Sequence, residues 1–324
     1  MPNMNLKLGR PRFDESPKGA SPGVGDQPVV TSGFTLNLMK NLLPPSPRSF
    51  PRWLGSFALL LALAGGVQAE PWTRLYVFGD SYSDSGAGYV DGNGPTAVVY
   101  LARALNLPFT AANDPQGNGL GLNFAVSGAQ TGAGRGSRVK DSLLGRGMQD
   151  QVADFVGRVN SGAVRFPAPD TLFFLAGGLN DSQLPTPVTI ANLTNELRAL
   201  YAVGARHFYV ALLPTKIPAF AAVGLRLNPA IAAIPAAVHL DGATVRLSHW
   251  GMFYDQVLTE PGRYGLTNTT AACAGRALFN QDPAPRGDPE KYYYYHDGHP
   301  STAVHRAVGR ALADEIRRAG AAAP

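Results

Sequence analysis

The chain has 324 residues, of which 45% are hydrophobic and 16% charged, with 37 glycines and 27 prolines. This composition suits a loop-rich globular protein and excludes a coiled coil or a wholly disordered chain. Of the 28 basic and 23 acidic residues, seven and three lie in residues 1–69, so the remainder carries 21 and 20 and is close to neutral. Such a balance gives no electrostatic basis for binding nucleic acid or an acidic membrane surface.

The N-terminal part predicts segments that are not part of the fold. Residues 1–38 are polar and rich in Pro, Gly and Ser, so we expect them to be disordered or absent from the native product. Residues 39–69 place basic residues before a short apolar run and end in small residues, which is the layout of a secretory signal. A membrane anchor is the alternative, but the run is short for a span. Cleavage after Ala69 would release residues 70–324, without an integral membrane segment, to the periplasm or medium.

Cys273 is the single cysteine of the chain. No intramolecular disulfide is possible, so a hydrophobic core has to stabilise the mature domain, which is long enough to bury one. Nothing around Cys273 supports a nucleophile, and a structural thiol is the expected role.

The stretch that carries the chemistry begins at Leu75. Leu75 to Phe78 are β-formers and aromatics, which predicts a buried strand of an α/β sheet. Gly79 and Asp80 end this strand and leave the hydroxyl of Ser81 at its C-terminal edge, where ligands of open α/β sheets bind. Taken alone, a Gly-Asp-Ser tripeptide is more often a turn with a solvated serine, so the rest of the chain has to decide.

Strands and helices alternate along the mature chain, which indicates βαβ units, a mainly parallel sheet and one catalytic domain. Gly132–Ser137 lacks the Gly-Lys-Ser/Thr ending of a phosphate-binding loop and is expected to be a mobile loop. Residues 217–237 could form a helix or part of a lid. Periodicity predicts helices over 95–105, 142–159, 187–203, 250–258 and 302–318, and strands over 171–176, 208–213 and 245–247.

Several reactive side chains follow predicted strands or lie in loops. Acyl transfer by a serine needs a hydroxyl, a base, a group that orients the base and donors for the oxyanion. These roles can be filled by Ser81, His299, Asp297, the N–H of Gly128 and the side-chain amide of Asn180.

Metal binding is the alternative role for the histidines near the C-terminus. His296 and His299 on one loop make an incomplete ligand set, so we expect neither a metal nor another cofactor.

Four blocks in order carry a family resemblance that extends from about Arg74 to Arg318. The sequence resembles the GDSL esterase/lipase family, of SGNH-hydrolase fold, with Tyr82 where Leu is usual. The blocks are Phe78–Gly86, Asn123–Ala129, Gly178–Asp181 and Asp255–Cys273. The resemblance implies a three-layer α/β/α flavodoxin-like sandwich and a small-molecule ester or lipid as substrate.

The resemblance also implies a role for each matching residue. Ser81 would be the nucleophile and first oxyanion donor, Gly128 and Asn180 the other donors, and His299 the general base oriented by Asp297.

The chain departs from the family pattern at the aspartate that orients the histidine. The family places its Asp three residues before the His, where this chain has His296. Either the loop adjusts so that the Asp297 carboxylate reaches the ring, or the base works with a backbone carbonyl.

The expected activity is that of a secreted serine esterase or lipase that cleaves carboxylic esters through an acyl-enzyme. Within the same family, the alternatives are phospholipid deacylation or acyl transfer, and deacetylation of polysaccharides. A non-catalytic carbohydrate- or lipid-binding protein of the same fold is the alternative from another class.

Overall fold

The computed structural model describes residues 72–321. The expected N-terminal extension (1–38) and the expected signal (39–69), with its cleavage after Ala69, lie outside the described residues. Among residues 72–321 no helix is both long and apolar enough to cross a membrane.

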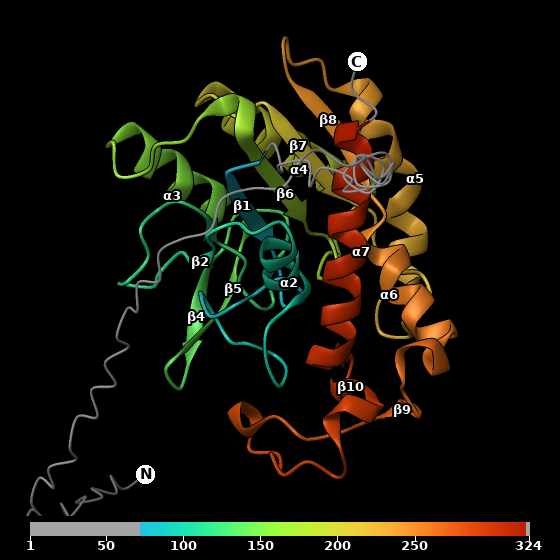
Figure 1. The fold of residues 1–324 in the computed structure, drawn as a ribbon. Coiled ribbons are helices and arrows are strands. Elements are labelled where there is room, and N and C mark those ends of the chain that lie inside the picture. The colour runs from blue at the N-terminus through green and yellow to red at the C-terminus, as the bar shows by residue number, and fades with distance from the viewer. Residues whose placement is uncertain (1–71, 322–324) are drawn as a thin grey trace, which may run out of the picture. The chain divides into compact units, whose positions relative to one another are not determined.

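A six-stranded sheet forms the centre of the fold, and all of its neighbouring strands are parallel (Figure 1). The strand order is β2-β3-β1-β6-β7-β8. Central strands of such a sheet are buried on both faces, which explains their continuous apolar runs. The strands are β1 (Arg74–Gly79), β2 (Thr110–Ala111), β3 (Leu122–Asn123), β6 (Thr171–Ala176), β7 (His207–Ala211) and β8 (Thr244–Ser248).

In residues 72–321, six helices pack around this sheet in a three-layer α/β/α arrangement, which confirms the predicted fold class. The helices form two groups. In one group α7 packs against α2 and α6, and in the other α4 packs against α3 and α5. The ring of Phe155 on α3 contacts Tyr76 and Phe78 of β1, so this helix covers one face of the central strand. The helices are α2 (Ala97–Ala104), α3 (Met148–Asn160), α4 (Thr186–Ala202), α5 (Ala221–Ala237), α6 (Trp250–Thr259) and α7 (Thr302–Ala321).

A β-hairpin replaces part of a predicted helix and a predicted loop. Strands β4 (Arg135–Val139) and β5 (Ser142–Arg146) pair antiparallel, and α3 begins only at Met148. The prediction of a helix from residue 142 is therefore wrong over its first six residues, and the expected loop at 132–137 is a strand from Arg135 onward. Gly145 has a φ of +71°, which breaks the helical path that the leucine spacing had suggested.

Residues 217–237, for which two interpretations were open, form helix α5 over most of their length. Its buried residues recur at helical spacing and face the core, although Pro229 and Pro235 lie inside the helix. The remaining elements are a small sheet of β9 (Asn268–Ala272), β10 (Tyr292–His296) and β11 (His299–Pro300), and 3₁₀ turns at Ala168–Asp170, Pro261–Tyr264, Ala277–Phe279 and Pro289–Lys291.

Candidate active site

The loops that follow three neighbouring strands meet at the C-terminal edge of the sheet. Gly79 ends β1 in register with Ala176, the last residue of β6. On the other side, the N–H of Val126 donates to the Gly79 carbonyl at 3.2 Å and extends the pairing with β3. Ser81, the loop containing Gly128 and the loop containing Asn180 therefore start from adjacent points on one edge, where open α/β sheets bind their ligands.

Ser81 lies in a tight turn directly after β1. The N–H groups of Ser83 and Asp84 donate to the Asp80 carbonyl at 3.0 and 2.9 Å, which closes the turn. Ser81 retains only 7% of its surface exposed. Its Oγ is 2.8 Å from Nε2 of His299, so a residue 218 positions further along the chain is within hydrogen-bonding distance.

Tyr82 holds the turn that carries the histidine against the turn that carries the serine. Its side chain is completely buried, and its hydroxyl donates to the Gly298 carbonyl at 2.7 Å. Leucine, which is usual at this position of the family block, has no hydroxyl to make this bond. The tyrosine at position 82 therefore links the turn of Ser81 to the turn that precedes His299.

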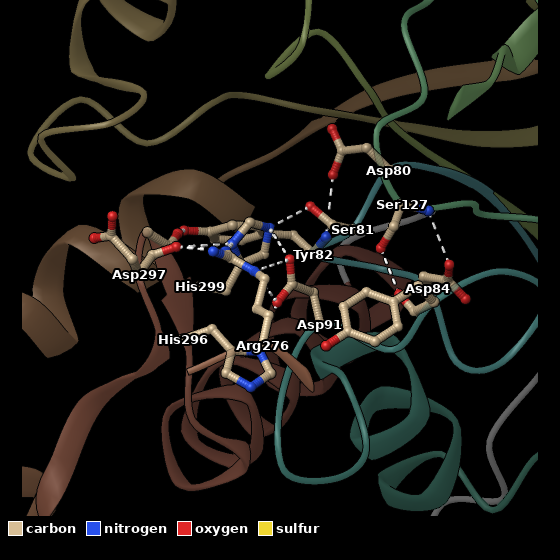
Figure 2. Close-up of polar contacts among 12 residues, drawn as sticks. Asp80, Ser81, Tyr82, Asp84, Asp91, Ser127, Arg276, His296, Asp297 and His299 are labelled. Carbon is tan, nitrogen blue, oxygen red and sulfur yellow. Dashed lines mark hydrogen bonds and ion pairs between the residues drawn. The ribbon is translucent and has the colours of Figure 1, made fainter. Parts of the chain in front are cut away.

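His299 follows a two-residue turn between β10 and β11, and this turn determines the orientation of Asp297. The turn pairs His296 with His299, and Gly298 adopts a φ of +70°. The Asp297 carbonyl is 3.2 Å from Nδ1 of His299, whereas Figure 2 shows the Asp297 carboxylate pointing away from the ring. Of the two arrangements open for Asp297, the structure has the one in which the backbone carbonyl faces the ring of His299.

A buried charge cluster that the sequence did not indicate surrounds the same histidine. Nε of Arg276 donates to both carboxylate oxygens of Asp91 at 2.8 and 2.9 Å. The imidazole of a second histidine, His296, places its Nδ1 2.7 Å from Oδ1 of Asp91. Asp91 Oδ2 is 3.3 Å from Nε2 of His299. No motif marks Asp91 or Arg276, because each lies in a loop far in sequence from the histidine.

The electrostatics of the cluster favour an ionised Asp91 and a neutral His299. Burial raises the pKa of Asp91, but hydrogen bonding to His296 and the charges of His299 and Arg276 outweigh it and hold the pKa below its usual value. Burial lowers the pKa of His299, Asp91 raises it and Arg276 lowers it again, with a net decrease. A neutral imidazole at neutral pH is able to accept a proton.

Two of the three candidate oxyanion donors, Gly128 and Asn180, lie on loops that are hydrogen-bonded to each other. Gly128 has a φ of +78°, a backbone conformation that favours glycine. Nδ2 of Asn180 donates to the Ala129 carbonyl at 2.9 Å, and Nε2 of Gln130 donates to the Asn180 carbonyl at 3.0 Å. An amide NH₂ has two hydrogens, so Asn180 keeps one donor beyond this bond.

Buried carboxylates fix these loops. Asp84 accepts hydrogen bonds from the N–H groups of Ser127 at 2.8 Å and Gly86 at 2.9 Å, which joins the loop after β1 to the loop after β3. Asp181 accepts from the N–H of Thr131 at 3.1 Å and from its hydroxyl at 2.5 Å. Each carboxylate thus ties neighbouring loops together by charge-assisted hydrogen bonds.

Asp80, which directly precedes Ser81, is completely buried. Its Oδ1 accepts from the N–H of Tyr82 at 3.1 Å. Burial raises the pKa of Asp80 to about 7, against the opposing effect of this hydrogen bond. Residues 72–321 contain no group of three or more His, Cys, Asp or Glu side chains arranged to hold a metal ion.

Together, the fold and this edge define an α/β protein in which a serine at the C-terminal end of a parallel strand contacts a histidine from the small sheet. A family model described as GDSL-like Lipase/Acylhydrolase matches residues 75–312, and the chain belongs to this family.

Two curated relatives and a solved structure are similar to this chain. The thermolabile hemolysin of Vibrio parahaemolyticus is 25% identical over 291 residues, which cover 76% of this chain and 64% of the hemolysin. A GDSL esterase/lipase of Arabidopsis thaliana is 26% identical over 335 residues, covering 78% of this chain and 90% of the plant protein. A lipolytic G-D-S-L protein from Veillonella parvula aligns with a TM-score of 0.40 and 14% identity over 75% of this chain and 97% of that protein.

Proposed function

We propose that the protein is a serine esterase that hydrolyses carboxylic esters through an acyl-enzyme. The observation that carries this proposal is the 2.8 Å contact between Ser81 Oγ and His299 Nε2 at the sheet edge. In the proposed mechanism the Ser81 oxygen attacks the ester carbonyl while His299 takes its proton, and the histidine then protonates the departing alcohol. Water repeats the sequence to release the acid.

The orienting and stabilising roles complete the proposal. Asp297 would orient the base through its main-chain carbonyl, the group that faces Nδ1. The oxyanion donors would be the backbone N–H groups of Ser81 and Gly128 and the side-chain amide of Asn180. Donors of this kind stabilise the charge that develops in the transition state of acyl transfer.

Replacing Ser81 with alanine tests the proposal. We expect Ser81→Ala to fold normally, to lose labelling by a serine-reactive phosphonate and to lose turnover on a panel of chromogenic esters of increasing acyl length. Ser161→Ala, at the exposed C-terminal end of α3, is the matched control and should retain both. Ester turnover of the Ser81→Ala protein at the wild-type rate would refute the assignment.

A second candidate substrate is a phospholipid. It is favoured by the similarity to a protein named as a hemolysin, which lyses blood cells. Both substrates require Ser81, so Ser81→Ala does not distinguish them. Comparing the rates on short soluble esters and on phospholipid vesicles does.

We also propose that the protein is secreted, on the signal-like pattern of residues 39–69. N-terminal sequencing of the exported protein should give Glu70 as the first residue.

A further inference from the structure

The ion pair of Asp91 and Arg276 contacts both ring nitrogens of His299 (Figure 2). Asp91 Oδ2 is 3.3 Å from Nε2, and Arg276 Nη2 is 2.7 Å from Nδ1. The side chains of Asp91 and Arg276 are only 8% and 14% exposed. The imidazole is therefore held between an anion on its reactive side and a cation on its other side.

The chemistry of the guanidinium determines which nitrogen of the ring carries the proton. Arginine has N–H donors and no acceptor, so Nη2 of Arg276 can only donate to Nδ1. Nδ1 must then be the nitrogen without a hydrogen, and the proton of the neutral ring lies on Nε2. Nε2 has two acceptors within reach, Asp91 Oδ2 and Ser81 Oγ, which suit a protonated Nε2.

This arrangement is the opposite of what a general base needs. To take the Ser81 proton, Nε2 has to present its lone pair, and the ring hydrogen must be on Nδ1. The acceptor for an Nδ1 hydrogen is present, because the Asp297 carbonyl is 3.2 Å away. Arg276 Nη2 also donates to this carbonyl at 2.5 Å and so occupies the site.

We propose that Asp91 and Arg276 form a latch on the base: in the free enzyme they hold His299 with its hydrogen on Nε2, and Arg276 has to leave Nδ1 before Ser81 is deprotonated. The activity part of this inference rests on the proposed esterase function, whereas the position of the ring hydrogen does not. Both residues are positioning residues, since they act through His299.

His296 anchors the latch. It occupies the position where the family has its acid, and its Nδ1 contacts Asp91 Oδ1 at 2.7 Å. The carboxylate beside the ring of His299 therefore comes from Asp91, in the loop after β1, and His296 holds it in place. Because Asp91 contacts Nε2 and not Nδ1, it stabilises the protonated form of that nitrogen instead of orienting the ring for catalysis.

The groups that act on the ring come from every element packed around it. They are Asp91 and Tyr82 from the loop after β1, Arg276 from the loop after β9, His296 at the end of β10, Asp297 from the turn that follows it, and His305 from α7. Of these, only Asp91 and Arg276 carry full charges in contact with the imidazole nitrogens, so the test concentrates on them.

The position of the ring hydrogen can be measured directly by long-range ¹H–¹⁵N NMR of protein with ¹⁵N-labelled histidine. The chain has six histidines, and His299→Gln assigns the signal. At pH 8, without substrate, we expect the neutral His299 ring to carry its hydrogen on Nε2. A hydrogen on Nδ1 in the wild-type protein would overturn the proposal, whether or not the protein hydrolyses esters.

Variants of the two latch residues should have opposite effects. Arg276→Met should move the ring hydrogen to Nδ1 and shift the acid limb of the pH profile of kcat/KM upward by about one pH unit, because a cation leaves the ring. Asp91→Asn should shift the limb downward by a similar amount, because an anion leaves. A purely structural role would lower activity in both without opposite shifts, and that result would refute the latch.

Two further variants keep the test of the latch interpretable. If Arg276→Met does not fold, Arg276→Lys keeps the charge and is expected to retain the wild-type position of the acid limb, and the wild-type NMR measurement remains decisive. Ser81→Ala separates the two proposals. If it retains ester turnover, the proposed function fails, but the ring hydrogen is still measured independently.

Discussion

Asn180 is the candidate oxyanion donor that can be removed by substitution, because the other two are backbone N–H groups. Asn180→Ala should lower kcat by about 10²–10³, the usual effect of losing one such donor. KM should change little, since the interaction is made mainly in the transition state. Steady-state kinetics on a short-chain ester measure both constants.

Asn180 also bonds to the Ala129 carbonyl, so a structural effect has to be separated from a catalytic one. The circular dichroism and melting temperature of the variant serve this purpose. Asn160→Ala, at the exposed end of α3, is the matched control and should keep wild-type kinetics. A fully folded Asn180→Ala protein with unchanged kcat would show that Asn180 is only a turn residue.

Glu196 places a carboxyl group in the core, and the proposed mechanism does not use it. It lies on α4 with 1% of its surface exposed, and among the described residues neither carboxylate oxygen has a hydrogen-bond partner. Burial, together with the nearby charge of Asp181, raises its pKa well above the usual value. Deprotonation of this side chain therefore costs more free energy in the folded protein than in the unfolded chain.

Glu196→Met should accordingly stabilise the protein, by about 1–3 kcal/mol, because an unpaired buried polar group is replaced by an apolar side chain. A group with a raised folded pKa contributes stability that is lost as pH rises above its unfolded pKa. The gain should thus be larger at pH 8 than at pH 5, as measured by urea unfolding. The exposed Glu260→Met is the control, and an equal gain in both variants would contradict this account.

Among the elements, helices α2 and α7 approach each other closely at a glycine of α7. A Cβ added to Gly309 would lie 2.5 Å from the Ala97 carbonyl oxygen and 2.5 Å from Cβ of Tyr100. Helix α7 begins just after His299, and its Thr302 contacts the Tyr100 hydroxyl at 2.9 Å. The close packing of these two helices therefore fixes the start of α7 next to the base.

Gly309→Ala should lower the free energy of unfolding by about 1–3 kcal/mol, because backbone and side-chain atoms would have to move apart. Gly157→Ala in α3 is the matched substitution, since a Cβ there would meet nothing within 4 Å. It should raise the free energy of unfolding by about 0.5–1 kcal/mol through helix propensity alone. Chemical denaturation measures both, and effects of the same sign would argue against close α2–α7 packing.

On the scale of the whole molecule, the fold and the candidate site lie within one part of the chain. The family match covers residues 75–312, and the described core and the Ser81–His299 pair lie within residues 72–321. We therefore expect a chain that begins at Glu70 to match the full-length chain in melting temperature and to have kcat/KM on a soluble ester within about twofold of it, since the contacts that form the site remain. A melting temperature lower by about 5 °C or more, measured by calorimetry, would show that the first 69 residues stabilise the fold.

Sequence reasoning located the parts of the fold that depend on local pattern. The strand at 171–176 matches β6, because a strand buried on both faces is a continuous apolar run. Helix α4 was predicted to within one residue at each end, and its buried leucines, Leu193, Leu197 and Leu200, recur at helical spacing. The β4–β5 hairpin was missed, since Leu143 and Leu144 fit a helical period and the backbone conformation of Gly145 is not visible in composition.

The sequence by itself determined the family, the α/β class and the candidate pair Ser81 and His299, because these follow from short motifs and from periodicity within single segments. Only the tertiary structure decided that the Asp297 carbonyl faces His299 and that Asp91 and Arg276 contact both of its ring nitrogens. The physical reason is distance. A hydrogen bond forms at about 3 Å, and nothing in the local pattern of a chain indicates which residues, here more than 200 positions apart, will come that close.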